Sequence, residues 1–240
     1  MKQVVVIPTY NEAENMPVIL PRIRKIMPEL HILVVDDNSP DGTADLVEKL
    51  NETLGGVEVM RRAGKQGLGP AYIAAFTRLL AQGYEAIGQM DADLSHDPSY
   101  LPPMFGAMNE FDIAIGSRYV AGGGTKNWGL SRKIISRGGG LYANTILGLN
   151  VKDLTSGFRV WRAEVLRAVD LPTIACKGFG FQIEMTHRAI RQGYRFKEFP
   201  IVFANRTRGQ AKMSGGIFWE ALVNVWKMRA YRPPQRHEAR

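Results

Sequence analysis

Two aspartates separated by a single residue follow an apolar segment of strand length. Asp91 and Asp93 come directly after residues 86–90, with Ala92 between them. Alternate residues of an extended chain point to the same side, so both carboxylates face one space. Two carboxylates that close repel each other unless a cation lies between them, and oxygen ligands alone favour Mg²⁺ or Mn²⁺. A solvated turn is the alternative for an isolated Asp-x-Asp, but the position at a strand end favours a metal site.

The loop after the first apolar segment offers side chains to a ligand. Residues 8–12 read Pro-Thr-Tyr-Asn-Glu and contain no glycine. A dinucleotide-binding turn or a P-loop would place glycines here, so the loop argues against both. The Tyr10 ring and the Glu12 carboxylate suit a base and a ribose better than a pyrophosphate. The alternative is that Tyr10 packs in the core and Glu12 caps a helix.

The elements that position these residues alternate between strands and helices. Apolar runs predict strands at residues 4–7, 31–36, 57–60, 86–90 and 112–116, and amphipathic patterns predict helices at 14–26, from Asp41 or Thr43 to 50, and at 67–83. This alternation predicts a parallel, three-layer α/β sheet. Ligands of such sheets bind outside the carboxyl ends of the strands, where residues 10–12, 36–38 and 91–93 fall.

The second half of the sequence is less regular. It predicts strands at 158–161 and 195–201, helices at 131–147, 181–192 and 216–231, a mobile glycine loop at 122–124, a basic loop at 205–214 and a disordered tail at 233–240. Arg159 and Arg162 can be read as surface residues of their strand, an interpretation favoured for Arg162. Because no linker separates the halves, we expect residues 1–232 to form one domain.

Charge is divided unevenly along the 240 residues. Residues 1–120 carry a net charge of −6 and residues 121–240 a net charge of +14, within a total of +8. The basic half indicates an anionic partner. Aromatic residues are not interleaved with the basic ones and no nucleic-acid motif is present, so we expect no nucleic-acid partner. Cys176 is the only cysteine, and no apolar run reaches 18 residues, which together predict an intracellular protein without a membrane span.

Six ordered motifs resemble those of the family 2 glycosyltransferases of GT-A fold. They are Val-Ile-Pro-Thr-Tyr-Asn-Glu (6–12), Val-Val-Asp-Asp-Asn-Ser-Pro-Asp-Gly-Thr (34–43), Met-Asp-Ala-Asp-Leu-Ser-His-Asp-Pro (90–98), Gly-Ser-Arg-Tyr (116–119), Thr-Ser-Gly-Phe-Arg (155–159) and Arg-Thr-Arg-Gly-Gln-Ala-Lys (206–212). Within that family, the set is similar to the dolichol-phosphate (polyprenol-phosphate) mannose synthases. The resemblance extends over residues 3–230.

The resemblance implies a role for each matching residue. The positions that hold the base and ribose match Pro8, Tyr10, Glu12 and Asp37, and those of the metal and diphosphate site match Asp91 and Asp93. The positions around the acceptor phosphate match Arg118, Arg132, Ser136 and Arg206. A basic loop that closes over the phosphates in this family matches Arg206 and Lys212. Asp93, Arg206 and Lys212 are the expected catalytic residues. Ser95 stands where the family often has a metal-binding glutamine, and Ala211 replaces the usual serine before Lys212.

The implied reaction moves mannose from GDP-mannose to a polyprenyl (dolichyl) phosphate with Mg²⁺ or Mn²⁺ and inverts the anomeric carbon. The nucleophile is a phosphate oxygen whose second pKa is about 6, so it is ionised at neutral pH without a general base. His96, beside the aspartates, is therefore expected to be structural. The half of the chain up to residue 120 would bind the nucleotide sugar, and the half from 121 to 232 the acceptor.

The last predicted helix is rich in aromatic and apolar residues. Phe218, Trp219, Leu222, Val223, Val225 and Trp226 are followed by Lys227, Arg229 and Arg232. This surface could pack in the core, meet a membrane interface or bind a membrane-embedded partner subunit. An insoluble lipid acceptor requires some membrane association, so we expect a peripheral protein on the cytoplasmic face of a membrane.

Two alternatives remain at this point. The same fold could transfer glucose or another sugar from a UDP donor to a lipid phosphate. A basic nucleic-acid-binding or regulatory protein is the alternative from another class, and the retained Asp91, Asp93 and Arg206 argue against a catalytically silent regulator.

Overall fold

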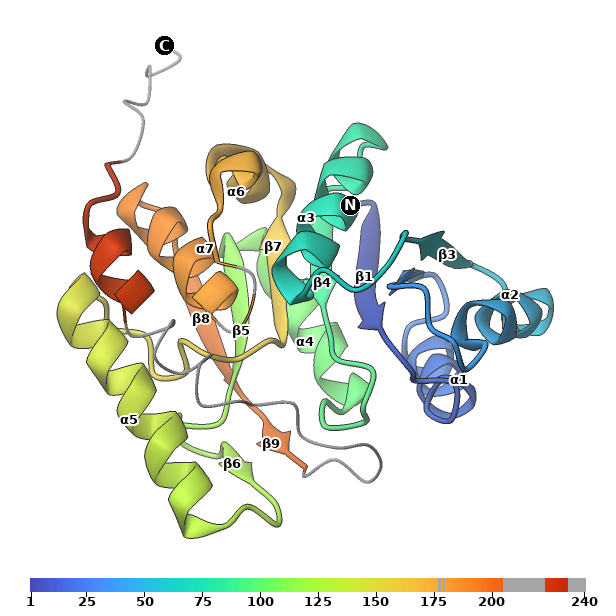
Figure 1. Cartoon of the computed structure of the whole chain (residues 1–240), viewed down its shortest axis with the longest axis horizontal. Helices are drawn as coiled ribbons and strands as arrows, with labels where there is room; N and C mark the ends of the chain where they lie inside the picture. Colours follow the sequence, from blue (N-terminus) through green and yellow to red (C-terminus); the bar gives the residue numbers. More distant parts are fainter. Residues whose placement is uncertain (177, 179, 205–222, 233–240) are drawn as a thin grey trace.

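A seven-stranded sheet organises the computed structural model, which describes residues 1–176, 178, 180–204 and 223–232 (Figure 1). The strands are β1 (Gln3–Thr9), β2 (His31–Asp36), β3 (Val57–Arg61), β4 (Ala86–Gln89), β5 (Ile113–Ser117), β7 (Arg159–Arg162) and β8 (Phe196–Pro200). Their order is β3-β2-β1-β4-β7-β5-β8. β7 runs antiparallel to both β4 and β5, while the other pairs are parallel. The sheet is therefore mostly parallel rather than wholly so.

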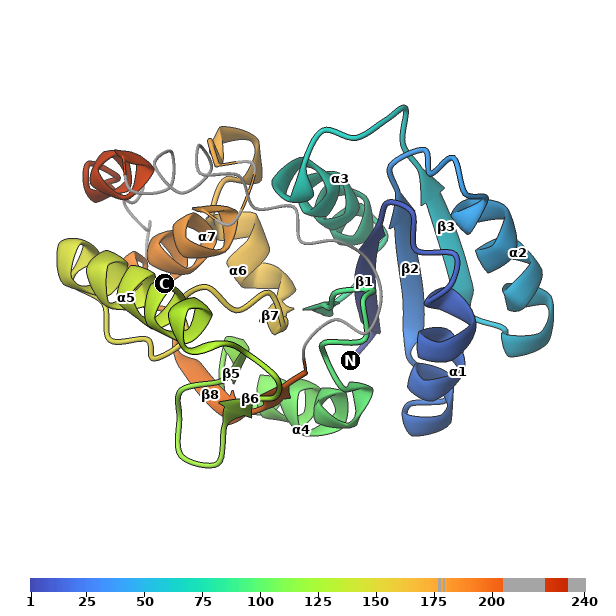
Figure 2. The same cartoon turned by 60° about the horizontal axis from the view of Figure 1, so that its bottom comes forward.

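Helices cover both faces of the sheet. They are α1 (Met16–Ile26), α2 (Thr43–Leu54), α3 (Leu68–Ala81), α4 (Leu101–Gly106), α5 (Leu130–Leu147), α6 (Ala163–Ala168) and α7 (Gly180–Arg191), with 3₁₀ turns at Pro98–Tyr100, Ala107–Asn109 and Leu171–Thr173. Figure 2 shows α1 and α4 on one side and α3, α6 and α7 on the other. Within the described ranges, no helix combines the length and the apolar character needed to cross a bilayer.

The alternation of side chains along β1 builds two separate cores. Val4 and Val6 belong to the apolar cluster that contains the buried residues of α3, whereas Val5 and Ile7 belong to the cluster that contains those of α1. Because successive residues of a strand point to opposite faces, a run of apolar residues fills both cores at once. The predicted three-layer α/β architecture is confirmed.

The structure departs from the sequence prediction at several points: α4 and α6 lie where no element is predicted, and α2 and the glycine loop differ from their predicted form. α2 continues to Leu54, one turn beyond the predicted end, and is preceded by Gly42 with φ of +78°. The predicted mobile glycine loop contributes β6 (Gly124–Thr125), which pairs in parallel with β9 (Val202–Phe203). Strands of two residues have no detectable period, so the sequence could not indicate them.

The predicted basic loop at 205–214 and the tail at 233–240 lie outside the described residues, as do residues 216–222 of the last predicted helix. Residues 223–229 are helical, as predicted. Val225 and Met228 of this segment are buried in the cluster that also contains Ala143 and Leu147 of α5.

Three consecutive glycines in the middle of α5 generate a stability prediction. A Cβ placed on Gly138 would meet no atom within 4 Å, and Gly138 is exposed. Alanine loses less backbone entropy in a helix than glycine, so Gly138→Ala should raise the free energy of unfolding by roughly 0.5–1 kcal/mol. Urea denaturation followed by circular dichroism measures the change.

Gly123→Ala is the matched control. A Cβ on Gly123 would lie 2.6 Å from the carbonyl oxygen of Ser117, so the same added methyl group should lower the free energy of unfolding there. Equal effects at the two positions would contradict the open surroundings of Gly138 and the crowded surroundings of Gly123.

Candidate functional site

Hydrogen bonds tie together the loops that follow β1 and β2. The buried Asp36 carboxylate accepts from Thr9 Oγ1 at 2.9 Å, and from the backbone N–H and hydroxyl of Ser39 at 2.8 and 2.6 Å. The backbone N–H of Glu12 donates to Thr43 Oγ1 at 3.0 Å. Asn38 adopts a left-handed conformation with φ of +58°, which asparagine tolerates better than most residues. The two loops therefore form one fixed edge.

The predicted nucleotide-binding residues lie along this edge. Pro8 lies near the end of β1 and is half-buried, as is Tyr10 in the loop that follows. The Nζ atom of Lys65 lies 4.4 Å from the centroid of the Tyr10 ring. The Glu12 carboxylate accepts a hydrogen bond from Asn15 Nδ2 at 2.7 Å. A ring, a cation and a carboxylate therefore border the same loop.

Asp37 forms an ion pair that the sequence did not indicate. Its buried carboxylate pairs with Arg62, whose guanidinium also donates to Gln66 Oε1 at 2.9 Å. Burial raises the pKa of Asp37, while the charge of Arg62 opposes that rise. Arg62 follows β3 directly, so the only available signal was a basic residue at the end of a neighbouring strand.

Asp93 and Asp91 lie in the loop that follows β4. Asp93 is buried, and its Oδ1 accepts from the backbone N–H of Ser95 at 3.1 Å and from the Ser95 hydroxyl at 2.5 Å. The Asp91 side chain remains 31% exposed. Ser95, which stands where the family often has glutamine, thus orients one of the two aspartates.

His96 holds the backbone of this loop. Its Nδ1 accepts the Asp91 backbone N–H at 3.1 Å, which places the ring proton on Nε2. The ring stacks on Phe158 at 4.8 Å between centroids and meets the edge of Phe203 at 5.2 Å. Burial lowers the pKa of His96, so the ring is neutral at pH 7. These contacts are those of a structural residue.

The loop before β7 lies against Asp91. A Cβ on Gly157 would lie 3.6 Å from Asp91 Oδ1, an ordinary contact distance, so the main chain passes directly beside that carboxylate. Arg159 fixes this loop by hydrogen bonds to its main chain. The Arg159 Nε donates to the Ser156 carbonyl at 2.7 Å, and its Nη2 donates to the Leu154 carbonyl at 2.7 Å. Its Nη1 donates to Thr186 Oγ1.

The structure corrects the surface interpretation of Arg159. Its side chain is completely buried, and burial lowers its pKa to about 10, which leaves the guanidinium charged at neutral pH. Arg162, at the far end of β7, is half-buried and pairs with Glu164 at 3.2 Å, close to the surface position expected for it.

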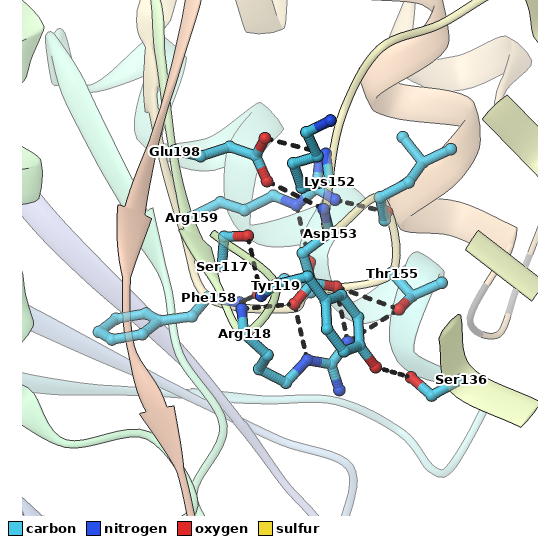
Figure 3. A network of polar contacts seen from close by, with 12 residues as sticks. Ser117, Arg118, Tyr119, Ser136, Lys152, Asp153, Thr155, Phe158, Arg159 and Glu198 are labelled. Carbon is cyan, nitrogen blue, oxygen red and sulfur yellow. Dashed lines mark hydrogen bonds and ion pairs between the residues drawn. The ribbon is translucent and has the colours of Figure 1, made fainter. Parts of the chain in front are cut away.

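Arg118 is held by a buried aspartate, as Figure 3 shows. Its Nε and Nη2 donate to the two carboxylate oxygens of Asp153 at 2.6 Å each, and its backbone N–H donates to Asp153 Oδ2 at 2.9 Å. Nη2 also donates to Thr155 Oγ1 at 2.9 Å. Glu198 in turn accepts the backbone N–H groups of Lys152 and Asp153, both at 2.9 Å. The fork of Arg118 is thus directed toward Asp153, which leaves Nη1 as the nitrogen without a hydrogen bond within the described part of the chain.

The other predicted acceptor-side residues lie on α5, next to Arg118. The Tyr119 hydroxyl donates to Ser136 Oγ at 2.8 Å (Figure 3). The guanidinium carbon of Arg132 lies 4.0 Å from the centroid of the Trp128 ring, and that of Arg118 lies 5.3 Å from the same ring. Arg118, Arg132 and Ser136 therefore surround Tyr119 and Trp128, two residues without a predicted role. Arg206 and Lys212 lie outside the described residues.

The buried Arg118–Asp153 pair generates a double-mutant prediction. Asp153→Ala leaves a buried guanidinium without its carboxylate and should lower the free energy of unfolding by roughly 3–5 kcal/mol. The double variant Arg118→Ala/Asp153→Ala should lose no more than Asp153→Ala alone, because the uncompensated charge is gone. Urea unfolding of the four proteins measures this coupling, and strictly additive losses would contradict the pairing.

The chain is similar to known proteins over nearly its whole length. Residues 4–170 match the profile of glycosyl transferase family 2. An undecaprenyl-phosphate mannosyltransferase of Micrococcus luteus is 49% identical over 232 residues, which cover 96% of either chain. A polyprenol monophosphomannose synthase of Mycolicibacterium smegmatis is 44% identical over 232 residues, covering 95% of this chain and 88% of the relative.

Solved structures share the fold at lower sequence identity. Glucosyl-3-phosphoglycerate synthase from Mycobacterium tuberculosis, in complex with phosphoglyceric acid, superposes with a TM-score of 0.70 at 15% identity, covering 98% of this chain and 82% of that one. A mannosyltransferase from Pyrobaculum calidifontis, in complex with GDP-Man and Mn²⁺, has a TM-score of 0.63 at 17% identity, covering 97% and 66%. The chain belongs to glycosyl transferase family 2 and has the GT-A fold that its motifs predicted.

Proposed function

We propose that the protein transfers mannose from GDP-mannose to a polyprenyl phosphate and releases GDP and polyprenyl phosphate β-mannose. The observation that carries the proposal is the similarity, over nearly the full length, to two enzymes named for mannose transfer to undecaprenyl phosphate and for polyprenol monophosphomannose synthesis. GDP-Man is the sugar nucleotide in the structure of the Pyrobaculum calidifontis mannosyltransferase, which supports the choice of donor.

The donor would bind along the edge formed by the loops after β1, β2 and β4. We assign its base and ribose to Pro8, Tyr10, Glu12 and Asp37. The ring of Tyr10 offers a stacking surface, and carboxylates suit ribose hydroxyls. The hydrogen bonds from Thr9 and Ser39 to Asp36 support this assignment, because they hold the two loops in fixed positions.

Asp91 and Asp93 are the residues proposed to hold a divalent cation, Mg²⁺ or Mn²⁺. Their donor set consists of carboxylate oxygens, which fits a hard ion. No cluster of three or more His, Cys, Asp or Glu side chains suited to a metal occurs among the described residues, so other ligands would come from the donor phosphates and water. A bound cation would neutralise charge on the departing diphosphate. Ser95 would keep Asp93 in place.

The acceptor phosphate would lie near Arg118, Arg132 and Ser136. One of its oxygens attacks the anomeric carbon of mannose while the bond to GDP breaks, so one displacement inverts that carbon. The nucleophile is already ionised near neutral pH, and the site needs orientation more than a base. Arg118 Nη1 and the guanidinium of Arg132 would orient the phosphate, with Arg206 and Lys212 proposed to bind phosphates as well.

The proposed lipid acceptor determines where in the cell the protein would act. A polyprenyl phosphate resides in a membrane, so we propose that the protein acts as a peripheral enzyme on the cytoplasmic face, with or without a membrane-embedded partner subunit. In this proposal residues 1 to about 120 hold the donor and residues from about 121 to 232, together with Arg118, hold the acceptor, within one domain.

Donor identity is tested by comparing three sugar nucleotides in separate incubations. Radiolabelled GDP-mannose, UDP-glucose and UDP-galactose are each incubated with one polyprenyl phosphate and the divalent cation. We expect lipid-linked label from GDP-mannose only. Label from UDP-glucose alone would establish the alternative UDP-sugar transferase, and label from none of the three would exclude both activities.

Asp93→Asn tests the metal site. The amide oxygen can still accept from Ser95, but the charge that would bind a cation is gone, so turnover should fall at least about a hundredfold. GDP binding measured by calorimetry should lose its dependence on Mn²⁺.

Asp97→Asn is the control. Asp97 lies four residues away and is exposed, and among the described residues its carboxylate accepts a hydrogen bond from the Ser99 backbone N–H alone, at 2.9 Å. This variant should keep near-normal turnover. A fully active Asp93→Asn enzyme would remove the basis for the metal assignment.

A further inference from the structure

The outer surface of α5 carries large apolar side chains in contact with solvent. Leu130 is 74% exposed, Ile134 is 62% exposed and Leu141 is 69% exposed. Their spacing of four and seven residues places them in one stripe along the helix. We call these three residues the outer stripe of α5. Exposed large apolar side chains gathered on one face of a helix indicate an interaction site.

The opposite side of the same helix faces the candidate acceptor site. Arg132, Ser136, Ala143 and Leu147 follow the same helical spacing, displaced by two residues, and so form an inner stripe about 200° away. Ala143 and Leu147 are buried in the core, Ser136 accepts from Tyr119, and Arg132 lies over Trp128. The side of α5 opposite the outer stripe therefore carries two polar residues near the site, of which Arg132 is exposed, and two core residues.

Cations border the outer stripe. Lys133 and Arg137 are exposed and occupy helical positions just beside it. The helix at residues 223–229 adds exposed Val223 and Trp226, with Lys227 and Arg229 exposed next to them. Both helices lie at the same end of the molecule in Figures 1 and 2. Among the described residues, every exposed large apolar side chain except Met1 belongs to these two helices.

We propose that the outer stripe of α5, together with Val223 and Trp226, docks on the surface of an anionic lipid bilayer. The choice of this occupant rests on the proposed function, in which the acceptor is a lipid phosphate, and on the charges beside the stripe. Apolar side chains bordered by lysine and arginine match the boundary between acyl chains and anionic headgroups. The inner stripe then faces away from the bilayer, with Arg132 and Ser136 close to the headgroups.

A second copy of the chain fits this surface less well. α5 contains no acidic residue, and neither do residues 223–232. A two-fold contact places the same patch on both partners, so it would bring Lys133 and Arg137 of one copy toward those of the other without a compensating carboxylate from these helices. An anionic membrane supplies that compensation.

Vesicle sedimentation of the full-length chain, without substrate, tests the proposal. Phosphatidylcholine vesicles are compared with vesicles that also contain phosphatidylglycerol. We expect binding mainly to the anionic vesicles. Ile134→Ser/Leu141→Ser should weaken it at least about tenfold, since two aliphatic side chains no longer leave water. Lys133→Glu/Arg137→Glu should weaken binding to anionic vesicles by a similar factor and reduce its salt dependence.

Arg22→Glu/Lys25→Glu is the matched control. Both residues are exposed on α1, at the other end of the molecule, and the variant makes the same change of net charge. It should bind anionic vesicles as the unmodified protein does. Circular dichroism and thermal melting verify that all variants are folded, which their exposed positions favour.

Transfer assays separate this proposal from the proposed function. Ile134→Ser/Leu141→Ser should keep mannose transfer to a short-chain, water-soluble prenyl phosphate and lose transfer to a vesicle-embedded acceptor. Vesicle binding without transfer to either acceptor would contradict the function and leave the docking surface intact. Binding that Ile134→Ser/Leu141→Ser does not weaken, or a dimer in light scattering that this variant dissociates, would overturn the docking surface.

Discussion

The completely buried guanidinium of Arg159 fixes the loop that both sides of the site share. It donates to the carbonyls of Leu154 and Ser156, and the chain continues from there to Gly157, directly beside Asp91. The same loop supplies Asp153, which directs Arg118. One segment therefore positions both the metal-binding candidates and the acceptor-side candidates. The guanidinium of Arg159 in turn holds that segment in place. A buried charge is costly unless it is satisfied, and here the main chain satisfies most of it.

β7 is the element that makes this arrangement possible. It lies between β4 and β5 and runs against both, so its first residue, Arg159, is at the edge where β4 and β5 end. A parallel strand in the same place would begin at the opposite edge. The loop before β7 therefore reaches the carboxyl ends of the neighbouring strands, where Asp91 follows β4 and Arg118 follows β5.

Much of the fold could be predicted because its signals are local. The apolar runs of β1, β2 and β4 and the amphipathic pattern of α1 agree closely with the observed elements, and Asp91 and Asp93 were placed at a strand end by spacing alone. Strand direction leaves no local period, so the antiparallel β7 was not predicted. The Arg118–Asp153 pair joins residues 35 positions apart, and Arg159 has the composition of a surface residue. Only tertiary packing determines these contacts. The outer stripe of α5 was missed because apolar spacing on a helix normally indicates a buried face.

The two stripes of α5 also bear on the length of the acceptor chain. An α-helix with its side chains is about 10 Å across. The polar layer on each side of a bilayer is roughly 5–8 Å deep, half the difference between total and hydrocarbon thickness. A helix that lies on the hydrocarbon boundary is thus about as thick as the headgroup layer is deep. A lipid phosphate would need to move only slightly out of that layer to reach the inner stripe. The prenyl units would stay in the bilayer, untouched by the protein. Such an enzyme would discriminate poorly between short and long polyprenyl phosphates, because the part that distinguishes them never leaves the lipid.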